Sequence, residues 1–303
     1  MADITVREVD LDGGDYRNAM THLLLHARAD DPMAGLWEAA DLQWWWTVGD
    51  DLASRRNTFW LDSGDRPLAC LLVAPHASEV AAPEPVYAEL LWRPGFDSLV
   101  RDQVVPVALQ RLANLAAGPD RPVSIYVDER DTDLRQRLQA AGFRHNSDGD
   151  MVQMWQRRDS PPGPLPLPDA MRFDDDRWRL PHQRHYLARR NGEHVVERLR
   201  ECSLYWSDLD LCIRTDTGDV AAYCLCWLDQ MNGVGLFEPV RTESDFQGRG
   251  LGRALLTEGI RRMMVEGANL LKVSRERTND PALRLYEAVG FREAFTKLRY
   301  VRT

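Results

Sequence analysis

Apolar residues along this chain recur either at every second position or at every third to fourth position, which predicts strands and helices respectively. In the first half, the two-residue period predicts strands near residues 4–9, 57–62, 68–74, 86–92 and 123–127. Helical spacing predicts helices near residues 16–29, 36–46 and 98–117, and another over 133–141 that runs into Gly142-Phe143. This mixture of strands and helices favours an α/β fold.

The second half carries the same kinds of pattern. Hairpin-type turns at Thr217-Gly218-Asp219 and Met231-Asn232-Gly233 separate three predicted strands. The strands are expected near residues 209–214, 220–228 and 233–241, with a fourth near 269–274 and a weakly indicated one at 171–173. Helices are expected near residues 183–190, 194–202 and 250–267, and from 282 to Gly290-Phe291.

A proline-rich segment lies between the two halves. Residues 159–168 contain five prolines, which are incompatible with a helix or a central strand. The segment is typical of a stiff, extended linker. We therefore expect two domains, residues 1–158 and 169–303, joined by the linker 159–168.

The two halves resemble distant copies of one unit. Each half has a strand, a long amphipathic helix, a second strand, a helix ending in Gly-Phe, and a final short strand. The glycine of each Gly-Phe pair suits the left-handed turn that ends many helices. This shared order predicts tandem duplication of one α/β unit.

Composition narrows the function. The formal net charge of −9 argues against broad nucleic-acid binding and against anionic membrane surfaces, because both need a basic face. The N-terminal residues have no apolar run typical of a secretion signal, and no run of about 18 apolar residues predicts a membrane span. Five cysteines, an odd number, then favour reduced thiols and a cytoplasmic protein. Cys224 and Cys226 are expected to be small core residues on a strand rather than metal ligands.

The most informative segment is the loop Gln247-Gly248-Arg249-Gly250-Leu251-Gly252, between a predicted strand and a predicted helix. Its glycines allow close approach of the backbone to a ligand, and the helix N-terminus adds N–H groups and a positive dipole end. Arg249 and Arg253 add positive charge. The loop therefore predicts an anion site suited to a pyrophosphate. The dinucleotide-binding and Walker forms of glycine-rich loop are not matched.

Together with the residues downstream, this loop resembles the GNAT acetyltransferase superfamily. The family's pyrophosphate motif [QR]-x-x-G-x-[GA] is matched by Gln247, Gly250 and Gly252. Its later pattern N-x-x-A-x-x-L-Y-x-x-x-G-F is matched by Asn279, Ala282, Leu285, Tyr286, Gly290 and Phe291. The two-domain layout is similar to the tandem GNATs of actinobacteria. The resemblance implies two tandem GNAT folds, each a mixed central sheet flanked by helices.

The resemblance also implies roles for individual residues. Val240, Arg241 and Thr242 would bind the pantetheine arm and the acyl carbonyl through backbone groups. Tyr286 would protonate the departing thiolate. Asn279 would contact the pantetheine or help to place the loop. The co-substrate would be acetyl-CoA or another short acyl-CoA, with no metal.

Glu238 is the candidate general base, because it lies on the strand that leads into the loop and a half-buried carboxylate there can accept a proton. In many relatives the base lies about two residues earlier, where this chain has Leu236, so a structural role for Glu238 remains open. Asp229 is expected to be a turn residue. His182, His185 and His194 are expected to be solvated helix residues, with an acceptor-site role as the alternative. Tyr205-Trp206 would either line the acceptor site or pack at the start of a strand.

The first half lacks this chemistry. At the position of the loop it has Arg93-Pro94-Gly95-Phe96, with one glycine and a proline that has no N–H. Leu138 stands at the position of Tyr286. Trp44-Trp45-Trp46 cannot all face one core, because successive helix residues differ by about 100° in direction. We therefore expect a degenerate first domain that binds no CoA and docks against the second.

The sequence thus predicts an N-acyltransferase that moves an acetyl or other small acyl group directly from CoA to an amine in a ternary complex. The acceptor is expected to be a small-molecule amine of unspecified identity, and the oligomeric state is not indicated. The alternatives are a regulatory protein that binds acyl-CoA without turnover and a generic phosphate-binding regulator.

Overall fold

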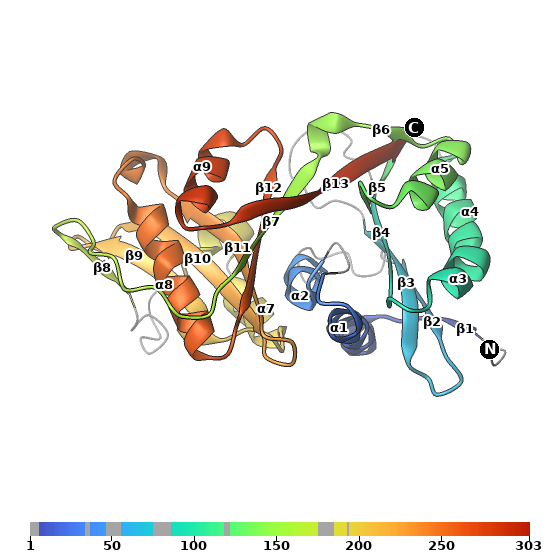
Figure 1. Ribbon diagram of the computed structural model, residues 1–303, viewed down its shortest axis with the longest axis horizontal. Coiled ribbons are helices and arrows are strands. Elements are labelled where there is room, and N and C mark those ends of the chain that lie inside the picture. The colour runs from blue at the N-terminus through green and yellow to red at the C-terminus, as the bar shows by residue number, and fades with distance from the viewer. Residues whose placement is uncertain are drawn as a thin grey trace. The chain divides into compact units, whose positions relative to one another are not determined.

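The predicted strands and helices assemble into two sheet-and-helix units in the computed structural model, which describes residues 6–33, 37–46, 56–74, 86–117, 122–174, 185–192 and 194–303. Unit 1 comprises residues 1–151 and 295–303, and unit 2 comprises residues 152–294 (Figure 1). In the described part of the chain, no helix is both long and apolar enough to cross a membrane.

Unit 1 is built on a mixed sheet with the strand order β1-β2-β3-β4-β5-β13, in which β6 also pairs with β13. Strands β4 and β5 of this unit pair in parallel. The strands are β1 (Arg7–Asp10), β2 (Arg56–Leu61), β3 (Pro67–Ala74), β4 (Val86–Trp92), β5 (Val123–Asp128), β6 (Arg144–His145) and β13 (Arg292–Arg302).

Helices cover both faces of this sheet (Figure 1). They are α1 (Gly13–Asp30), α2 (Ala39–Trp46), α3 (Asp97–Leu99), α4 (Val105–Ala116) and α5 (Thr132–Ala140). Alternate residues of β3 face opposite sides, so Leu71 joins the core under α4 while its neighbours Cys70 and Leu72 are buried outside that core cluster.

The helix expected over 98–117 is interrupted. A π-helical turn, Val100–Val104, separates α3 from α4, and the Val105 N–H donates to the Val100 carbonyl. Pro106 explains this interruption, because a proline has no backbone N–H to donate to a carbonyl of the preceding turn.

Unit 2 has the strand order β7-β12-β11-β10-β9-β8. Here β11 and β12 are parallel, whereas β10 is antiparallel to both β11 and β9. The strands are β7 (Met151–Arg157), β8 (Met171–Phe173), β9 (Asp210–Thr215), β10 (Val220–Asp229), β11 (Val234–Thr242) and β12 (Leu270–Glu276).

The helices of unit 2 are α6 (Ala188–Asn191), α7 (Val195–Glu201), α8 (Leu251–Val265) and α9 (Asp280–Ala288). Helix α8 lies across β9 to β11 (Figure 1). Its close approach depends on Gly259, where an added Cβ would lie 2.7 Å from both Cys226 Sγ and Phe237 Cε1. The main core of unit 2 therefore lies between α8 and the sheet.

The ends of the two halves depart from the expected domain bounds. Residues 295–302 of β13 belong to unit 1, where Lys297–Arg302 pair with Asp128–Val123 of β5 and where Leu298 and Tyr300 are core residues. Residues 152–157 of β7 belong to unit 2, and Val152 and Met154 enter its core. Each unit therefore contains the last strand of the other half of the sequence.

The proline-rich segment 159–168 forms no helix or strand, as its composition predicts. It lies within unit 2, and Leu167 packs against the core of that unit. The segment is therefore part of one unit as well as a connection after β7.

Candidate active site

The site predicted from the sequence lies where β11 and β12 stop pairing. Their parallel register runs from Val234↔Leu270 to Phe237↔Val273, although β11 continues to Thr242 and β12 to Glu276. Residues 238–242 are therefore outside the β11–β12 ladder, and residues 240–242 pair with β10 on their other side. The backbone groups of residues 240–242 that face the β12 side are not part of that ladder.

The loop after β11 has the backbone geometry of an anion site. Gly248 and Gly250 have positive φ angles of 75° and 80°, a region that residues with a Cβ rarely adopt. Gly250 is also the N-cap of α8, so the next N–H groups belong to the first turn of that helix. Apart from the adjacent residues of the chain, no atom of the described residues lies within 4 Å of a Cβ built on either glycine, so the space over the loop is open.

Side chains of the loop fix it to the end of β11. Gln247 Nε2 donates to the Thr242 carbonyl at 3.3 Å. Arg249 donates to the Asp245 carbonyl at 3.1 Å and lies over the Phe246 ring, 5.4 Å from its centroid. Arg249 and Arg253 are both exposed, so their charge is accessible to a ligand.

Gly252 brings α8, α9 and β11 together. A Cβ at Gly252 would lie 3.1 Å from Leu285 Cδ2 and 3.4 Å from Thr242 Oγ1. Leu251, in contrast, is buried in the core. The two residues therefore anchor the start of α8 against the rest of the site.

Asn279 is the N-cap of α9. Its Oδ1 accepts the Ala282 N–H at 3.1 Å, which satisfies one of the free donors at the helix start. In unit 1, Asp131 caps α5 in the same way, by accepting the Leu134 N–H at 3.0 Å. Asn279 thus helps to place α9, and with it Tyr286.

Tyr286 and Glu238 come from different elements but lie close enough to interact. Tyr286 is 6% exposed, and its ring packs at an angle against Phe291. Burial raises the pKa of Tyr286, the negative charge of Glu238 raises it further, and Arg275 opposes the shift. At neutral pH the phenol therefore keeps its proton, which is the form that a general acid requires.

A bulge at Glu238 and Pro239, which are joined by a cis peptide bond, changes the alternation of β11. Cys226 pairs with Phe237 and Cys224 pairs with Val240, so two residues of β11 fall opposite one residue of β10. Val240 therefore shares its face with Phe237. A strict two-residue alternation, which would group Glu238 with Val240 and Thr242, does not hold across this point.

The carbonyl of Glu238 is held by a buried tryptophan. Trp227 Nε1 donates to it at 2.6 Å. The Trp227 ring in turn packs edge-on against Tyr205, with 6.2 Å between the centroids. The backbone at the candidate base is thus fixed by a side chain from β10.

Sequence reasoning missed the polar network that continues from Tyr205. Asp210 accepts the Tyr205 hydroxyl at 2.9 Å, the Tyr186 hydroxyl, and His185 Nε2 at 3.0 Å. His185 Nδ1 accepts the Leu187 N–H at 3.0 Å, which leaves Nε2 to donate to Asp210. His185 and Asp210 are both buried, so the expectation that His185 is a solvated helix residue is wrong.

The other described residues considered in the sequence analysis do not belong to this network. Asp229 bonds to Asn232 in the turn before β11, as a turn residue would. His194 is exposed, and His182 lies outside the described residues. Trp44 is buried, whereas the side chains of Trp45 and Trp46 lie outside the described part.

Cys224 and Cys226 are buried with their sulfur atoms 3.8 Å apart. Burial raises the pKa of the Cys224 thiol, and its neighbour Cys226 raises it further. A neutral buried thiol is a poor nucleophile. Within the described residues, no group of three or more His, Cys, Asp or Glu side chains is arranged to hold a metal ion.

The model of the acetyltransferase (GNAT) family matches residues 150–291, nearly the same bounds as unit 2. These residues therefore match the GNAT acetyltransferase family. A segment of 58 residues is 49% identical to mycothiol acetyltransferase from Corynebacterium aurimucosum, and covers 19% of this chain and 17% of that protein. A segment of 89 residues is 33% identical to the [ribosomal protein bS18]-alanine N-acetyltransferase of Escherichia coli, and covers 29% of this chain and 59% of that protein.

Solved structures extend the GNAT fold to the whole chain. A tandem GNAT protein from the clavulanic acid biosynthesis pathway matches 98% of this chain and 98% of its own with a TM-score of 0.63, at 16% identity. A GCN5-related N-acetyltransferase from Sphaerobacter thermophilus matches 98% of this chain and 95% of its own with a TM-score of 0.57, at 17% identity. The tandem GNAT fold expected from the sequence is therefore confirmed.

Proposed function

We propose that unit 2 transfers an acetyl group from acetyl-CoA to the primary amine of a small molecule. The observation that carries the proposal is the convergence of three features at one point. These are the edge of residues 240–242 beyond the β11–β12 ladder, the two-glycine turn at the start of α8, and the buried phenol of Tyr286, on which the charge of Glu238 acts.

The loop supplies the groups that a CoA pyrophosphate needs. Backbone N–H groups of residues 248–252 point out of a left-handed turn and a helix start, a combination that favours phosphate oxygens. Exposed Arg249 and Arg253 add charge beside them. Val240, Arg241 and Thr242 lie beyond the β11–β12 ladder, and their backbone N–H and C=O groups on that side would hydrogen-bond the amide groups of the pantetheine arm.

The chemistry then needs one base and one acid. The amine nitrogen attacks the thioester carbonyl carbon, a C–N bond forms, and the C–S bond breaks. Glu238 takes the proton that the ammonium loses before attack, Tyr286 gives its proton to the departing thiolate, and the second proton that the nitrogen loses as the amide forms returns to Tyr286. A backbone N–H of residues 240–242 stabilises the oxyanion of the tetrahedral intermediate.

A protein that binds acyl-CoA without turnover would need the same loop but not the acid. Tyr286 is buried and keeps its proton, a state that the charge of Glu238 reinforces, and this favours the enzyme. Continuous release of CoA thiol from acetyl-CoA in the presence of an amine separates the two functions. By their names, one of the relatives above is a mycothiol acetyltransferase and the other acetylates an alanine of a ribosomal protein, and a small-molecule amine is our choice of acceptor class.

The test of the CoA site is Gly250→Val, measured by calorimetry with acetyl-CoA. A valine there would strain the left-handed backbone and cover the N–H groups, so binding should weaken by about 1–3 kcal/mol, which is about fivefold to 150-fold. Gly267→Val is the matched control. Gly267 has a φ angle of 104° and open space at its Cβ, but it follows the other end of α8.

If both variants fold and bind acetyl-CoA as the parent protein does, the loop is not the CoA site. If both lose binding equally, backbone strain and not the loop is the cause. Loss in Gly250→Val alone supports the proposal.

A further inference from the structure

Unit 1 contains a cavity of about 600 Å³ at the position that corresponds to the unit 2 site. The parallel register of β4 and β5 ends at Ala88↔Ile125, although β4 continues to Trp92 and β5 to Asp128. Residues from both continuing ends, Leu90 to Trp92 and Tyr126 to Asp128, line the cavity. Its volume is in the range of sites for small organic molecules.

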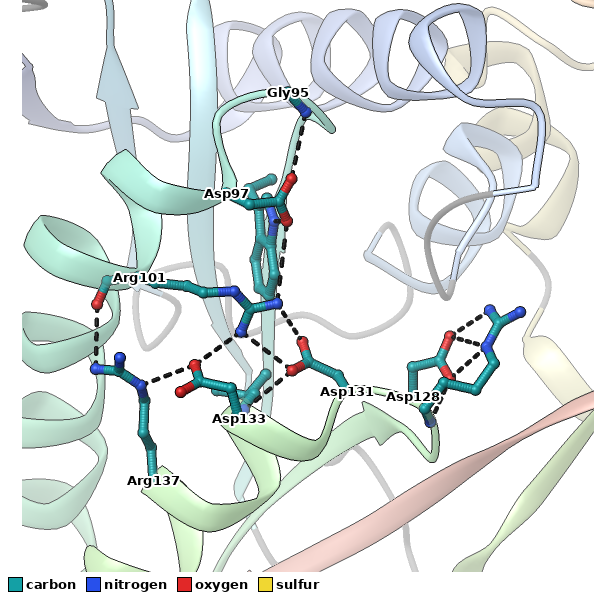
Figure 2. Close-up of polar contacts among 10 residues, drawn as sticks. Gly95, Asp97, Arg101, Asp128, Asp131, Asp133 and Arg137 are labelled. Carbon is teal, nitrogen blue, oxygen red and sulfur yellow. Dashed lines mark hydrogen bonds and ion pairs between the residues drawn. The ribbon is translucent and has the colours of Figure 1, made fainter.

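The anion site of this unit is occupied by a side chain of the protein itself. Asp97 Oδ2 accepts the Gly95 N–H at 3.3 Å, and Asp97 Oδ1 accepts Trp92 Nε1 at 2.9 Å (Figure 2). Pro94, which also lines the cavity, has no N–H. A carboxylate thus takes the donor that would face a phosphate in unit 2, and a pyrophosphate would meet like charge.

Most of the other charged side chains that line the cavity form ion pairs with one another. Arg101 makes two 3.0 Å bonds to Asp131 and one to Asp133, and it lies 4.0 Å from Asp97 (Figure 2). Arg130 Nε donates to Asp128 at 2.9 Å. The guanidinium groups of the wall are therefore already engaged by carboxylates, and they offer little to an anionic ligand.

Negative charge exceeds positive charge around the cavity. Five carboxylates line it, at Asp31, Asp97, Asp128, Asp131 and Asp133, against three guanidinium groups, at Arg28, Arg101 and Arg130, an excess of two. Arg28 is moreover held by Glu38, with Nε donating at 3.2 Å, and Glu38 is outside the lining. Asp31 accepts the Met33 N–H at 2.8 Å, a neutral donor.

Aromatic and apolar side chains form the rest of the wall. Trp37 and Tyr126 meet edge to face, with 6.1 Å between the ring centroids. Trp92 presents its ring to Arg101, whose Cζ lies 5.4 Å from the centroid. Leu24, Leu90 and Leu134 add apolar surface. The Trp37 ring already has a cation beside it, since Lys297 Nζ lies 3.4 Å from its centroid. Electron-rich rings beside carboxylates suit a cation better than a neutral or anionic molecule.

We propose that this cavity of unit 1 binds an organic ammonium ion, a primary amine with an aromatic or aliphatic body. The ammonium group lies among Asp31 and Asp97, and the body lies against Trp37, Trp92 and Tyr126. The duplicated site has in this way changed its ligand from a phosphate-bearing molecule to a cation. The inference concerns unit 1 alone and does not depend on the activity proposed for unit 2.

The test uses the full-length chain labelled with ¹⁵N at the tryptophan indoles and titrated with phenethylamine. Trp37→Phe and Trp92→Phe assign the two signals. Phenethylamine should shift both signals with saturation. Phenethyl alcohol, the same body without the charge, and 3-phenylpropionate, its anionic counterpart, should shift them at least about fivefold less at equal concentration.

Charge variants then locate the ammonium group. Asp31→Asn should weaken the binding of phenethylamine about fivefold or more. Asp102→Asn removes the same charge from an exposed residue of unit 1 that does not line the cavity, and it should leave binding unchanged. Equal shifts with the alcohol, equal losses in both variants, or no shift of either indole signal would overturn the proposal. Saturable shifts of both signals by acetyl-CoA in Gly250→Val would overturn it as well.

Discussion

Replacing Tyr286 with phenylalanine removes only the hydroxyl group, so this substitution distinguishes a role in proton transfer from a role in packing. The ring is buried against Phe291, so phenylalanine should fill the same space. We expect Tyr286→Phe to lower kcat at least about tenfold while acetyl-CoA affinity changes less than about threefold, because the proton is needed only when the thiolate leaves. Steady-state kinetics with calorimetry check this. Full turnover in a variant that melts normally would leave Tyr286 with a packing role alone.

Glu89 makes the stability of unit 1 depend on pH. It is buried on β4, and burial raises its pKa to about 8 from the ordinary 4.5, with Asp41 adding to the shift and Lys297 opposing it. Between these two values the folded chain holds a proton that the unfolded chain has released. The free energy of unfolding should therefore fall as pH rises through this range, by up to about 1.4 kcal/mol per pH unit from this group.

Glu89→Gln removes this proton from both states. Urea unfolding at pH 5, 6, 7 and 8 should show a shallower loss of stability in the variant than in the parent protein. Glu287→Gln, at an exposed position of α9, controls for the loss of a carboxylate. Parallel stability curves for Glu89→Gln and the parent chain would show that Glu89 is ionised in the folded state.

At the scale of elements, the sequence predicted most strands of both units to within one to three residues. The strand expected over 86–92 is β4, and the one expected over 220–228 is β10, at Val220–Asp229. Alternation and turn residues such as Gly218 are local signals, and they are enough to define such elements. The left-handed turn of the loop proposed to bind pyrophosphate could also be predicted, because the positive φ angles of Gly248 and Gly250 strain any residue with a Cβ.

Features that depend on contacts between residues far apart in the sequence could not be predicted from it. Asp210 looks like a residue at a strand start, and only folding brings His185 and Tyr186, more than twenty positions away, to its carboxylate. The bulge at Glu238 appears only in the register of β11 against β10. The residue pattern of a strand predicts which of its faces is buried, but it does not predict which strands it pairs with or in which register.

At the scale of the whole molecule, the two units are not the two halves of the sequence. The chain puts the end of β13 into unit 1 and most of β7 into unit 2. The match to the GNAT family model agrees, since it begins at residue 150, before the proline-rich segment, and ends at residue 291. A fragment cut at residue 169 would lack Val152 and Met154, which belong to the unit 2 core. Poor solubility of residues 169–303 is thus expected from this loss alone.

Two substitutions distinguish this division from the one expected from the sequence. Met154 and Tyr300 are both almost fully buried, Met154 in the core of unit 2 and Tyr300 in that of unit 1. Each should cost about 2–5 kcal/mol when truncated to alanine, because a cavity replaces the side chain. Hydrogen exchange followed by mass spectrometry reports where protection is lost.

Tyr300→Ala should increase exchange in β5, which pairs with its strand over six residues, and in α5, which shares its core. Met154→Ala should instead increase exchange in β12, the neighbour of β7, and in α9. A division into residues 1–158 and 169–303 requires the reverse, since it assigns Met154 to the first domain and Tyr300 to the second. Loss of protection in unit 2 for Tyr300→Ala and in unit 1 for Met154→Ala would therefore contradict the unit bounds, because a core residue destabilises first the unit in which it is packed.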